Sequence, residues 1–110
     1  MYQQGFDFPY QTAPDGAPVS LVIESTTSIS CSLTWSPPPE DQLNGLLRHY
    51  VIIIEEVDTG RNTSLTSTEP QIALSNLHPF YTYNIAVCAV TTDIGPCVYF
   101  DPVQLPQDGK

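Results

Sequence analysis

Basic residues are scarce in this chain. Only three of its 110 residues are Lys or Arg, against twelve Asp and Glu, and the formal net charge at pH 7 is -9. Such an acidic surface repels phosphate backbones and anionic lipid head groups. We therefore expect no nucleic acid among the partners of this chain and no binding to a membrane surface.

Long apolar runs are also missing. A helix that crosses a bilayer needs about 20 apolar residues in a row, and no stretch of the sequence approaches that length. The first residues lack the basic start and apolar centre of a secretory signal. We expect a soluble fragment whose signal or anchor, if there is one, lies outside it.

Residues suited to catalysis are few. His49 and His78 are the only two histidines, and the sequence places no Ser or Cys beside either of them. Glu55 and Glu56 are neighbours in a predicted strand, so they point to opposite faces and cannot form an acid–base pair. The glycines are scattered, and no loop has the spacing of oxygen ligands for calcium. We expect no enzyme activity, no cofactor, no bound metal and no small-molecule substrate.

Apolar residues recur at every second position from Pro18 onward, a spacing typical of strands with one buried face. The pattern predicts an all-β domain with seven strands and no helical segment. In the first three strands the inward positions are Val19, Leu21 and Ile23, then Ile29, Cys31, Leu33 and Trp35, then Tyr50, Ile52 and Ile54. The third strand is predicted at 48–56, and the others at 63–67, 71–74, 81–91 and about 98–105.

Turn signals separate these strands. They are the proline run 37–39, Asn44-Gly45, Asp58-Thr59-Gly60 and the segment 93–96. Pro102 suits an outer strand or a bulge. Leu77 and Pro79 close a turn that precedes Tyr83, whose hydroxyl can reach back to upstream backbone as in a tyrosine corner.

Several of these features resemble the fibronectin type III family. They are Trp35 with the proline run behind it, Pro38-Pro39-Glu40-Asp41 leading to Asn44-Gly45, Tyr50, Leu77-x-Pro79 with Tyr83, and Gly95-Pro96. The resemblance covers about Pro18 to Gln107, and the segment between the second and third strands is similar to that of receptor-type tyrosine phosphatases and neural adhesion receptors.

The resemblance implies a seven-stranded, two-sheet Greek-key sandwich of the immunoglobulin-like, fibronectin type III kind. Residues 1–17 would then be an N-terminal linker or tail, 18–107 the domain and 108–110 a C-terminal tail. The chain has no Arg-Gly-Asp between Thr91 and Pro96 and no Trp-Ser-x-Trp-Ser motif, so integrin binding and the cytokine-receptor role of some members are not carried over.

The three cysteines differ in their expected state. A hairpin turn centred between Thr92 and Asp93 would place Cys88 directly opposite Cys97, where the two could form a disulfide. Two reduced surface thiols are the alternative. Cys31 falls among the inward positions of its strand and is expected to be a small buried apolar residue.

Asn62-Thr63-Ser64 matches the N-glycosylation triplet near a predicted turn. Such triplets also arise by chance. Together with the possible disulfide and a family common outside cells, however, Asn62 favours an extracellular location for the chain.

One sheet face carries a candidate contact surface. In the third strand Val51 and Ile53 are expected to point outward, and the neighbouring strand adds Ala86 and Val90 to the same face. An apolar strip on an open face can mark a contact with a protein, although scattered exposed aliphatics also simply suit strands. We expect Val51, Ile53, Ala86 and Val90 to bind a protein partner or a neighbouring domain, with a glycan on Asn62 keeping the opposite region clear.

These observations favour a non-catalytic extracellular module of a larger cell-surface receptor or adhesion protein, itself monomeric, that acts as a spacer and a protein-interaction unit. An accessory spacer module of a secreted multidomain enzyme is the alternative. A third possibility is an intracellular muscle-type module, which predicts reduced cysteines and no glycan.

Overall fold

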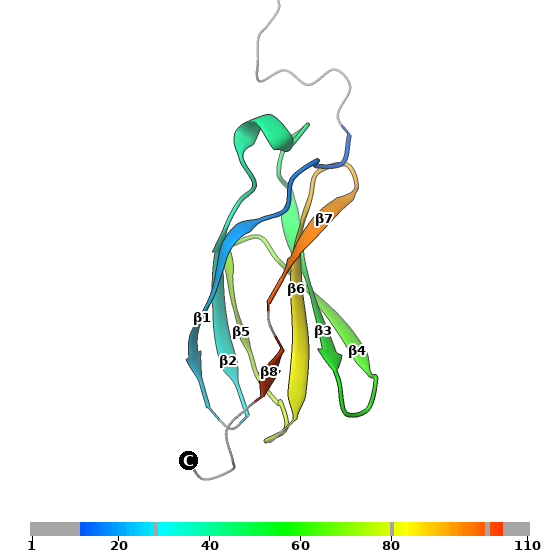
Figure 1. The fold of residues 1–110 in the computed structure, drawn as a ribbon. Helices are drawn as coiled ribbons and strands as arrows, with labels where there is room; N and C mark the ends of the chain where they lie inside the picture. Colours follow the sequence, from blue (N-terminus) through cyan, green and yellow to red (C-terminus); the bar gives the residue numbers. More distant parts are fainter. Residues whose placement is uncertain (1–11, 28, 80, 101, 105–110) are drawn as a thin grey trace, which may run out of the picture.

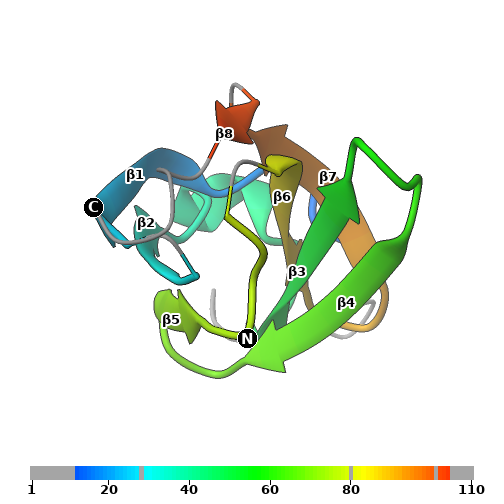
Figure 2. The same ribbon diagram turned by 90° about the horizontal axis from the view of Figure 1, so that it is seen from below.

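The structure, a computed structural model, describes residues 12–27, 29–79, 81–100 and 102–104. Two antiparallel sheets pack face to face, as the view along the strands shows (Figure 2). The strands are β1 (Val19–Thr26), β2 (Cys31–Ser36), β3 (His49–Glu56), β4 (Asn62–Ser67), β5 (Gln71–Leu74), β6 (Thr82–Val90), β7 (Ile94–Tyr99) and β8 (Val103–Gln104) (Figure 1).

The smaller sheet has the strand order β1-β2-β5. The larger sheet has the order β4-β3-β6-β7, and β8 also pairs with β6. Because β7 and β8 both pair with β6, they are two pieces of the last strand that the sequence predicts. The prediction of an all-β, two-sheet, seven-stranded sandwich is therefore confirmed.

The core lies between the two sheets and uses every second residue of the central strands. Trp35 is 5% exposed and Tyr83 only 1%, and the ring of Trp35 meets that of Tyr50 edge to face at a centroid distance of 5.2 Å. Side chains of this kind, fully removed from water, contribute most of the free energy of folding. The other buried members of the core are Cys31, Leu33, Ile52, Ile54, Leu74, Ile85, Val87 and Ala89.

The tyrosine corner is present as predicted. The backbone N–H of His78 donates a hydrogen bond of 2.8 Å to the hydroxyl oxygen of Tyr83. Burial raises the pKa of the Tyr83 phenol, so the group stays protonated and neutral in the core. The bond fixes the connection from β5 to β6 against the start of β6.

Two inward positions were predicted wrongly. Ile29 is 50% exposed, because Thr27 and Ser30 close a turn through a backbone hydrogen bond of 2.8 Å and hold Ile29 outside β2. Val19 is also exposed, because Ser20 has a φ of 58° and a register shift follows, which interrupts the alternation at the start of β1.

The last strand begins earlier than predicted and is interrupted. The backbone N–H of Thr91 donates a hydrogen bond of 3.2 Å to the carbonyl oxygen of Asp93 and closes the turn. β7 therefore already starts at Ile94, and the predicted turn at 93–96 is wrong. Pro102 lies at the break between β7 and β8, where its missing N–H costs no ladder bond.

A short 3₁₀ turn, Glu40–Gln42, follows the proline run, where no helical segment was expected. None of the helical structure in the described residues is long and apolar enough to cross a membrane. The predicted reversals at Asn44 and Gly60 are confirmed by their positive φ angles of 60° and 77°.

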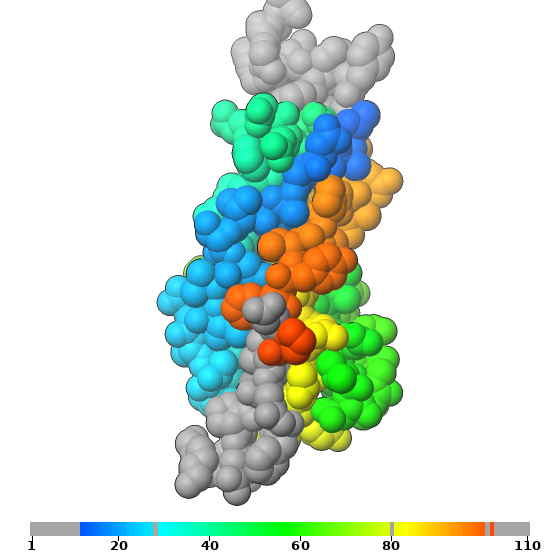
Figure 3. Space-filling view, viewed as in Figure 1, coloured from blue at the N-terminus to red at the C-terminus, as the bar shows by residue number. Residues whose placement is uncertain are grey.

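The structure describes residues 12–17 of the predicted N-terminal tail, and we call this segment the strap. It lies across one end of the sandwich, between the 42–44 loop and β7 (Figure 3). Thr12 N donates to Asn44 O at 3.0 Å and Asp15 N to Gln42 O at 2.7 Å, while the hydroxyl of Thr91 donates to Thr12 O at 2.6 Å. Residues 1–11 and 108–110 of the predicted tails lie outside the described residues, and the boundary at residue 18 stays a prediction.

The strap also packs closely against the first residues of β7. A Cβ built on Gly95 would lie 2.8 Å from the Cβ of Pro14 and 2.9 Å from its carbonyl oxygen. Only glycine therefore fits at this position without displacing the strap.

Replacing Tyr83 by Phe should lower the free energy of unfolding by about 1 kcal/mol, because the partly buried N–H of His78 loses its acceptor. Urea unfolding measures the change. Tyr99→Phe is the matched control, since Tyr99 is 74% exposed and should change stability little. Equal stability of the Tyr83 variant and the wild type would contradict the corner's role.

Replacing Thr91 by Val should cost about 1 kcal/mol, because Thr91 is 1% exposed and its hydroxyl is the donor to the strap. Hydrogen exchange should show a faster-exchanging Thr12 amide in this variant. Thr92→Val, on an exposed neighbour, should leave that amide unchanged. If both variants behave alike, the Thr91 bond does not hold the strap.

Candidate protein-contact surface

The register of the larger sheet decides which residues share its outer face, the face turned away from the core. Antiparallel residues directly opposite each other place their side chains on the same side of a sheet, and we call each such set across the strands a rung. Tyr50, Ile52 and Ile54 of β3 belong to the core. The outer face therefore takes His49, Val51, Ile53 and Glu55 from β3, as predicted, together with their partners on β4, β6 and β7.

Three successive rungs of the outer face are mainly apolar. Going along the strands, they are Ile53–Ala86–Tyr99, Val51–Cys88–Cys97 and His49–Val90–Ile94. Val51, Ile53 and Val90 are half-buried, so each presents part of its side chain to solvent. The predicted outward residues of β3 and β6 thus share one face with residues of β7, although Ala86 and Cys88 of β6 are buried and add almost no exposed surface.

Ala86 differs from the other three predicted contact residues because it is only 5% exposed. Its methyl group stands between the larger side chains of Ile53 and Tyr99 in the same rung. Ala86 therefore offers almost no surface of its own, and Val51, Ile53 and Val90 present the predicted surface.

Tyr99 and Ile94 belong to this surface but were missed by the sequence reasoning. Tyr99 is 74% exposed and Ile94 is also exposed. The sequence carried a signal for Tyr99: once Cys97 is placed opposite Cys88, the period of two puts Tyr99 on the same face. The period of two did not identify Ile94, because that residue was assigned to a turn.

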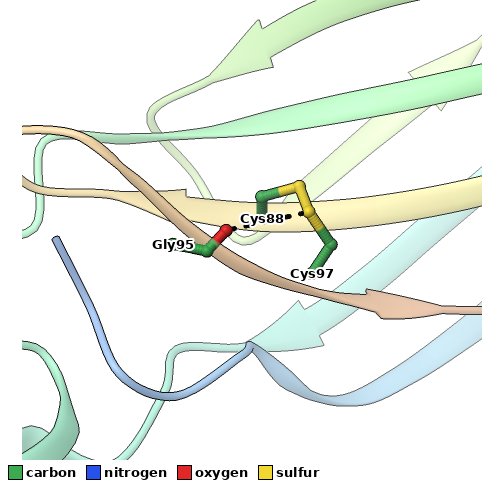
Figure 4. Close-up of a disulfide and its surroundings, with 3 residues drawn as sticks. All are labelled: Cys88, Gly95 and Cys97. Carbon is green, nitrogen blue, oxygen red and sulfur yellow. Dashed lines mark hydrogen bonds between the residues drawn. A yellow bond between two sulfur atoms is a disulfide. The ribbon is translucent and has the colours of Figure 1, made fainter.

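Cys88 and Cys97 form a disulfide across β6 and β7 (Figure 4). They are directly opposite in the register, with Cα atoms 4.1 Å apart, which confirms the predicted pairing. The Sγ atom of Cys97 lies 3.9 Å from the carbonyl oxygen of Gly95. Cys31 is a free, buried cysteine as expected, and burial raises the pKa of its thiol.

A polar rung ends the apolar surface on one side. It consists of Asn62, Glu55 and Asn84, and the side-chain amide of Asn84 donates to a carboxylate oxygen of Glu55 at 2.9 Å. The outer-face residues of β4 are Asn62, Ser64 and Thr66. Polar side chains therefore border the apolar rungs along one edge and at one end.

Asn62 lies where the sequence reasoning did not expect it. It is exposed and pairs with Glu55, so its side chain is on the same face as Val51 and Ile53. The expectation that a glycan on Asn62 would keep the opposite region clear is therefore wrong. The register between β4 and β3 cannot be read from their separate sequences.

The candidate catalytic groups are not brought together. Glu55 is bound by Asn84 on the outer face, whereas Glu56 accepts a hydrogen bond from the Thr59 hydroxyl at 2.8 Å. The ring of His78 stacks on that of Tyr81 at 4.7 Å, far along the chain from His49. Within the described residues, no three or more His, Cys, Asp or Glu side chains gather as metal ligands do.

Two clefts of the molecule lie away from the outer face. One, of about 370 Å³, separates β4 from β5 and is lined by Leu65, Leu74 and Arg61 among others. The other, of about 570 Å³, is lined by Glu24, Thr34 and Gln71 among others. No predicted contact residue lines either one. The candidate surface is thus a sheet face, a shape suited to another macromolecule rather than to a small ligand.

Sequence comparison relates this chain to large receptor and adhesion proteins. Receptor-type tyrosine-protein phosphatase F of Danio rerio is 29% identical over 85 residues, or 77% of this chain. Protein sidekick-2 of Mus musculus and the cell adhesion molecule DSCAM of Rattus norvegicus are each 34% identical over 86 residues, or 74% and 72% of this chain. The chain spans only 4% of the length of each of these relatives.

Solved structures share the fold. The third fibronectin III domain of a human protein matches with a TM-score of 0.79 at 19% identity, over 100% of this chain and 97% of its own length. The twitchin kinase region from C. elegans matches with a TM-score of 0.78 at 21% identity, over 90% of this chain and 18% of its own. The family model for the fibronectin type III domain matches residues 16–96. The chain belongs to the fibronectin type III domain family.

Proposed function

We propose that this chain is a non-catalytic extracellular module of a larger cell-surface receptor or adhesion protein, acting as a spacer and as a protein-interaction unit. The relatives include a receptor-type phosphatase and cell adhesion molecules. Fibronectin type III domains serve many purposes, so the fold alone does not assign this role.

The observation that carries the extracellular location is the Cys88–Cys97 disulfide. Disulfides form and persist in oxidising compartments and are rare in the cytosol. An intracellular muscle-type module is instead expected to keep both cysteines reduced. The exposed triplet at Asn62 supports the same location.

The spacer role is supported by where the described chain begins and ends. The strap lies at one end of the sandwich and β8 towards the other, so the described chain runs through the domain from end to end (Figure 1). The Thr91 bond attaches the strap at the entry end. Copies joined in this way would form an extended rod.

The interaction role is supported by the outer face. Exposed apolar side chains that gather on one face can mark a contact with a protein, and here the half-buried Val51, Ile53 and Val90 share a face with the exposed Tyr99. We propose this surface as the contact with a protein partner or with a neighbouring domain.

Protein made in a secretory host tests the location by mass spectrometry after alkylation. Unfolded without reductant, the chain should take up one alkyl group, on Cys31, because Cys88 and Cys97 are bonded. After reduction it should take up three, one on each cysteine. The peptide with Asn62 should carry a sugar mass. Three groups without reductant, and no sugar, would contradict an extracellular module.

Changing Val51 and Ile53 together to Thr tests the contact surface. Threonine keeps the branched shape that suits a strand but replaces a methyl group of Val51 and the ethyl group of Ile53 by a hydroxyl, so association with the adjoining domain, or of the chain with itself, should weaken roughly tenfold. Sedimentation or surface binding measures it. The matched control is Val22→Thr with Ile29→Thr, exposed positions of the smaller sheet or its turn. Unchanged association in the first pair would exclude the surface.

A further inference from the structure

Asn62 stands at a corner of the outer face. It is the first residue of β4, and β4 is an edge strand of the larger sheet, so no further strand among the described residues lies beside it. Its side chain shares a rung with Glu55 and Asn84. A sugar chain attached here starts on the outer face rather than beside it.

The apolar rungs lie within reach of that corner. The next rung, Ser64–Ile53–Ala86–Tyr99, is two residues along the strands, a distance of roughly 7 Å. From β4 to β7 there are three strand spacings, roughly 14–15 Å. A branched N-glycan is bulky enough to cover such an area. A glycan on Asn62 can therefore reach Tyr99 while it stays on the outer face.

The chemistry of the face suits a carbohydrate. Pyranose rings have apolar C–H faces and polar hydroxyl edges, and the face offers the exposed ring of Tyr99 beside the half-buried Ile53. Glu55 supplies a carboxylate acceptor and Asn84 a side-chain amide, and both lie in the same rung as Asn62. Sugars with one apolar face and hydroxyls at the rim match this arrangement.

Charge points to the same kind of occupant. Although the chain carries a net charge of -9, the acidic residue of the four rungs is Glu55 alone, and its carboxylate is already bound by Asn84. A strongly basic or strongly acidic partner would therefore meet almost no opposite charge on this face. A neutral occupant fits better.

We propose that an N-linked glycan on Asn62 lies over the Ile53–Tyr99 end of the outer face and closes it, so that occupancy of Asn62 determines whether the face is open to another protein. The inference rests on the proposed extracellular function. It adds to that function a means of regulation through one modification at the border of the contact surface.

Hydroxyl-radical footprinting of the secreted chain tests the proposal. Oxidation of Tyr99, read by mass spectrometry, should be severalfold lower in the glycosylated chain than in the same protein after enzymatic removal of the glycan, or in Asn62→Gln. Ile29 is 50% exposed and lies outside the larger sheet, so its oxidation should not change. This internal reference corrects for differences in radical dose.

A matched variant moves the glycan to the other sheet. Ser25→Asn creates the triplet Asn-Thr-Thr at an exposed position of β1, and combined with Asn62→Gln it gives a chain with one glycan of the same kind. In this variant Tyr99 should be as reactive as in the bare chain. A glycan acting merely by bulk or solubility would instead protect Tyr99 from either position.

Two results would overturn the proposal. One is equal oxidation of Tyr99 in the Asn62-glycosylated and bare chains, which would leave the extracellular function intact. The other is a secreted chain that carries no sugar on Asn62. A secreted chain without sugar in which all three cysteines are also free without reductant would contradict the proposed function itself. The failure of this proposal and the failure of the proposed function can therefore be distinguished.

Discussion

The register between β3 and β6 is the constraint on which the rest of the structure depends. The two strands pair without a shift from His49–Val90 to Glu56–Tyr83. A slip by one residue would turn every side chain of one strand to the opposite face. The register therefore determines the core, the position of Cys88 for its bond to Cys97, and the rungs of the outer face.

Much of this arrangement could be predicted because it is local and periodic. The period of two assigned Trp35 and Tyr83 to the core correctly. Counting outward from one turn placed Cys88 opposite Cys97. The tyrosine corner could be foreseen as well, since His78 and Tyr83 are only a few residues apart. In each case the interacting groups lie on one strand or on neighbours joined by one short turn.

What escaped prediction depends on backbone pairing and turn geometry rather than on the alternation of residues along one strand. The bond from Thr91 to Thr12 joins residues 79 positions apart in the sequence. The face on which Asn62 lies is set by its pairing with Glu55 across a turn that contains Gly60. Ile29 fitted the alternation of β2 but lies in a turn held by Thr27 and Ser30. Periodicity carries no information about such contacts.

The outer face thus places a disulfide, an apolar surface and an exposed glycosylation triplet on one side of one sheet. Whether they share that side is tested most directly by NMR contacts between backbone Hα protons of β3, β4 and β6. The account predicts contacts that join directly opposite residues of non-hydrogen-bonded pairs, such as Ile54 with Ile85 and Glu55 with Asn62. Contacts from Ile54 to Asn84 or Ala86 in place of Ile85 would show a shifted register and contradict it.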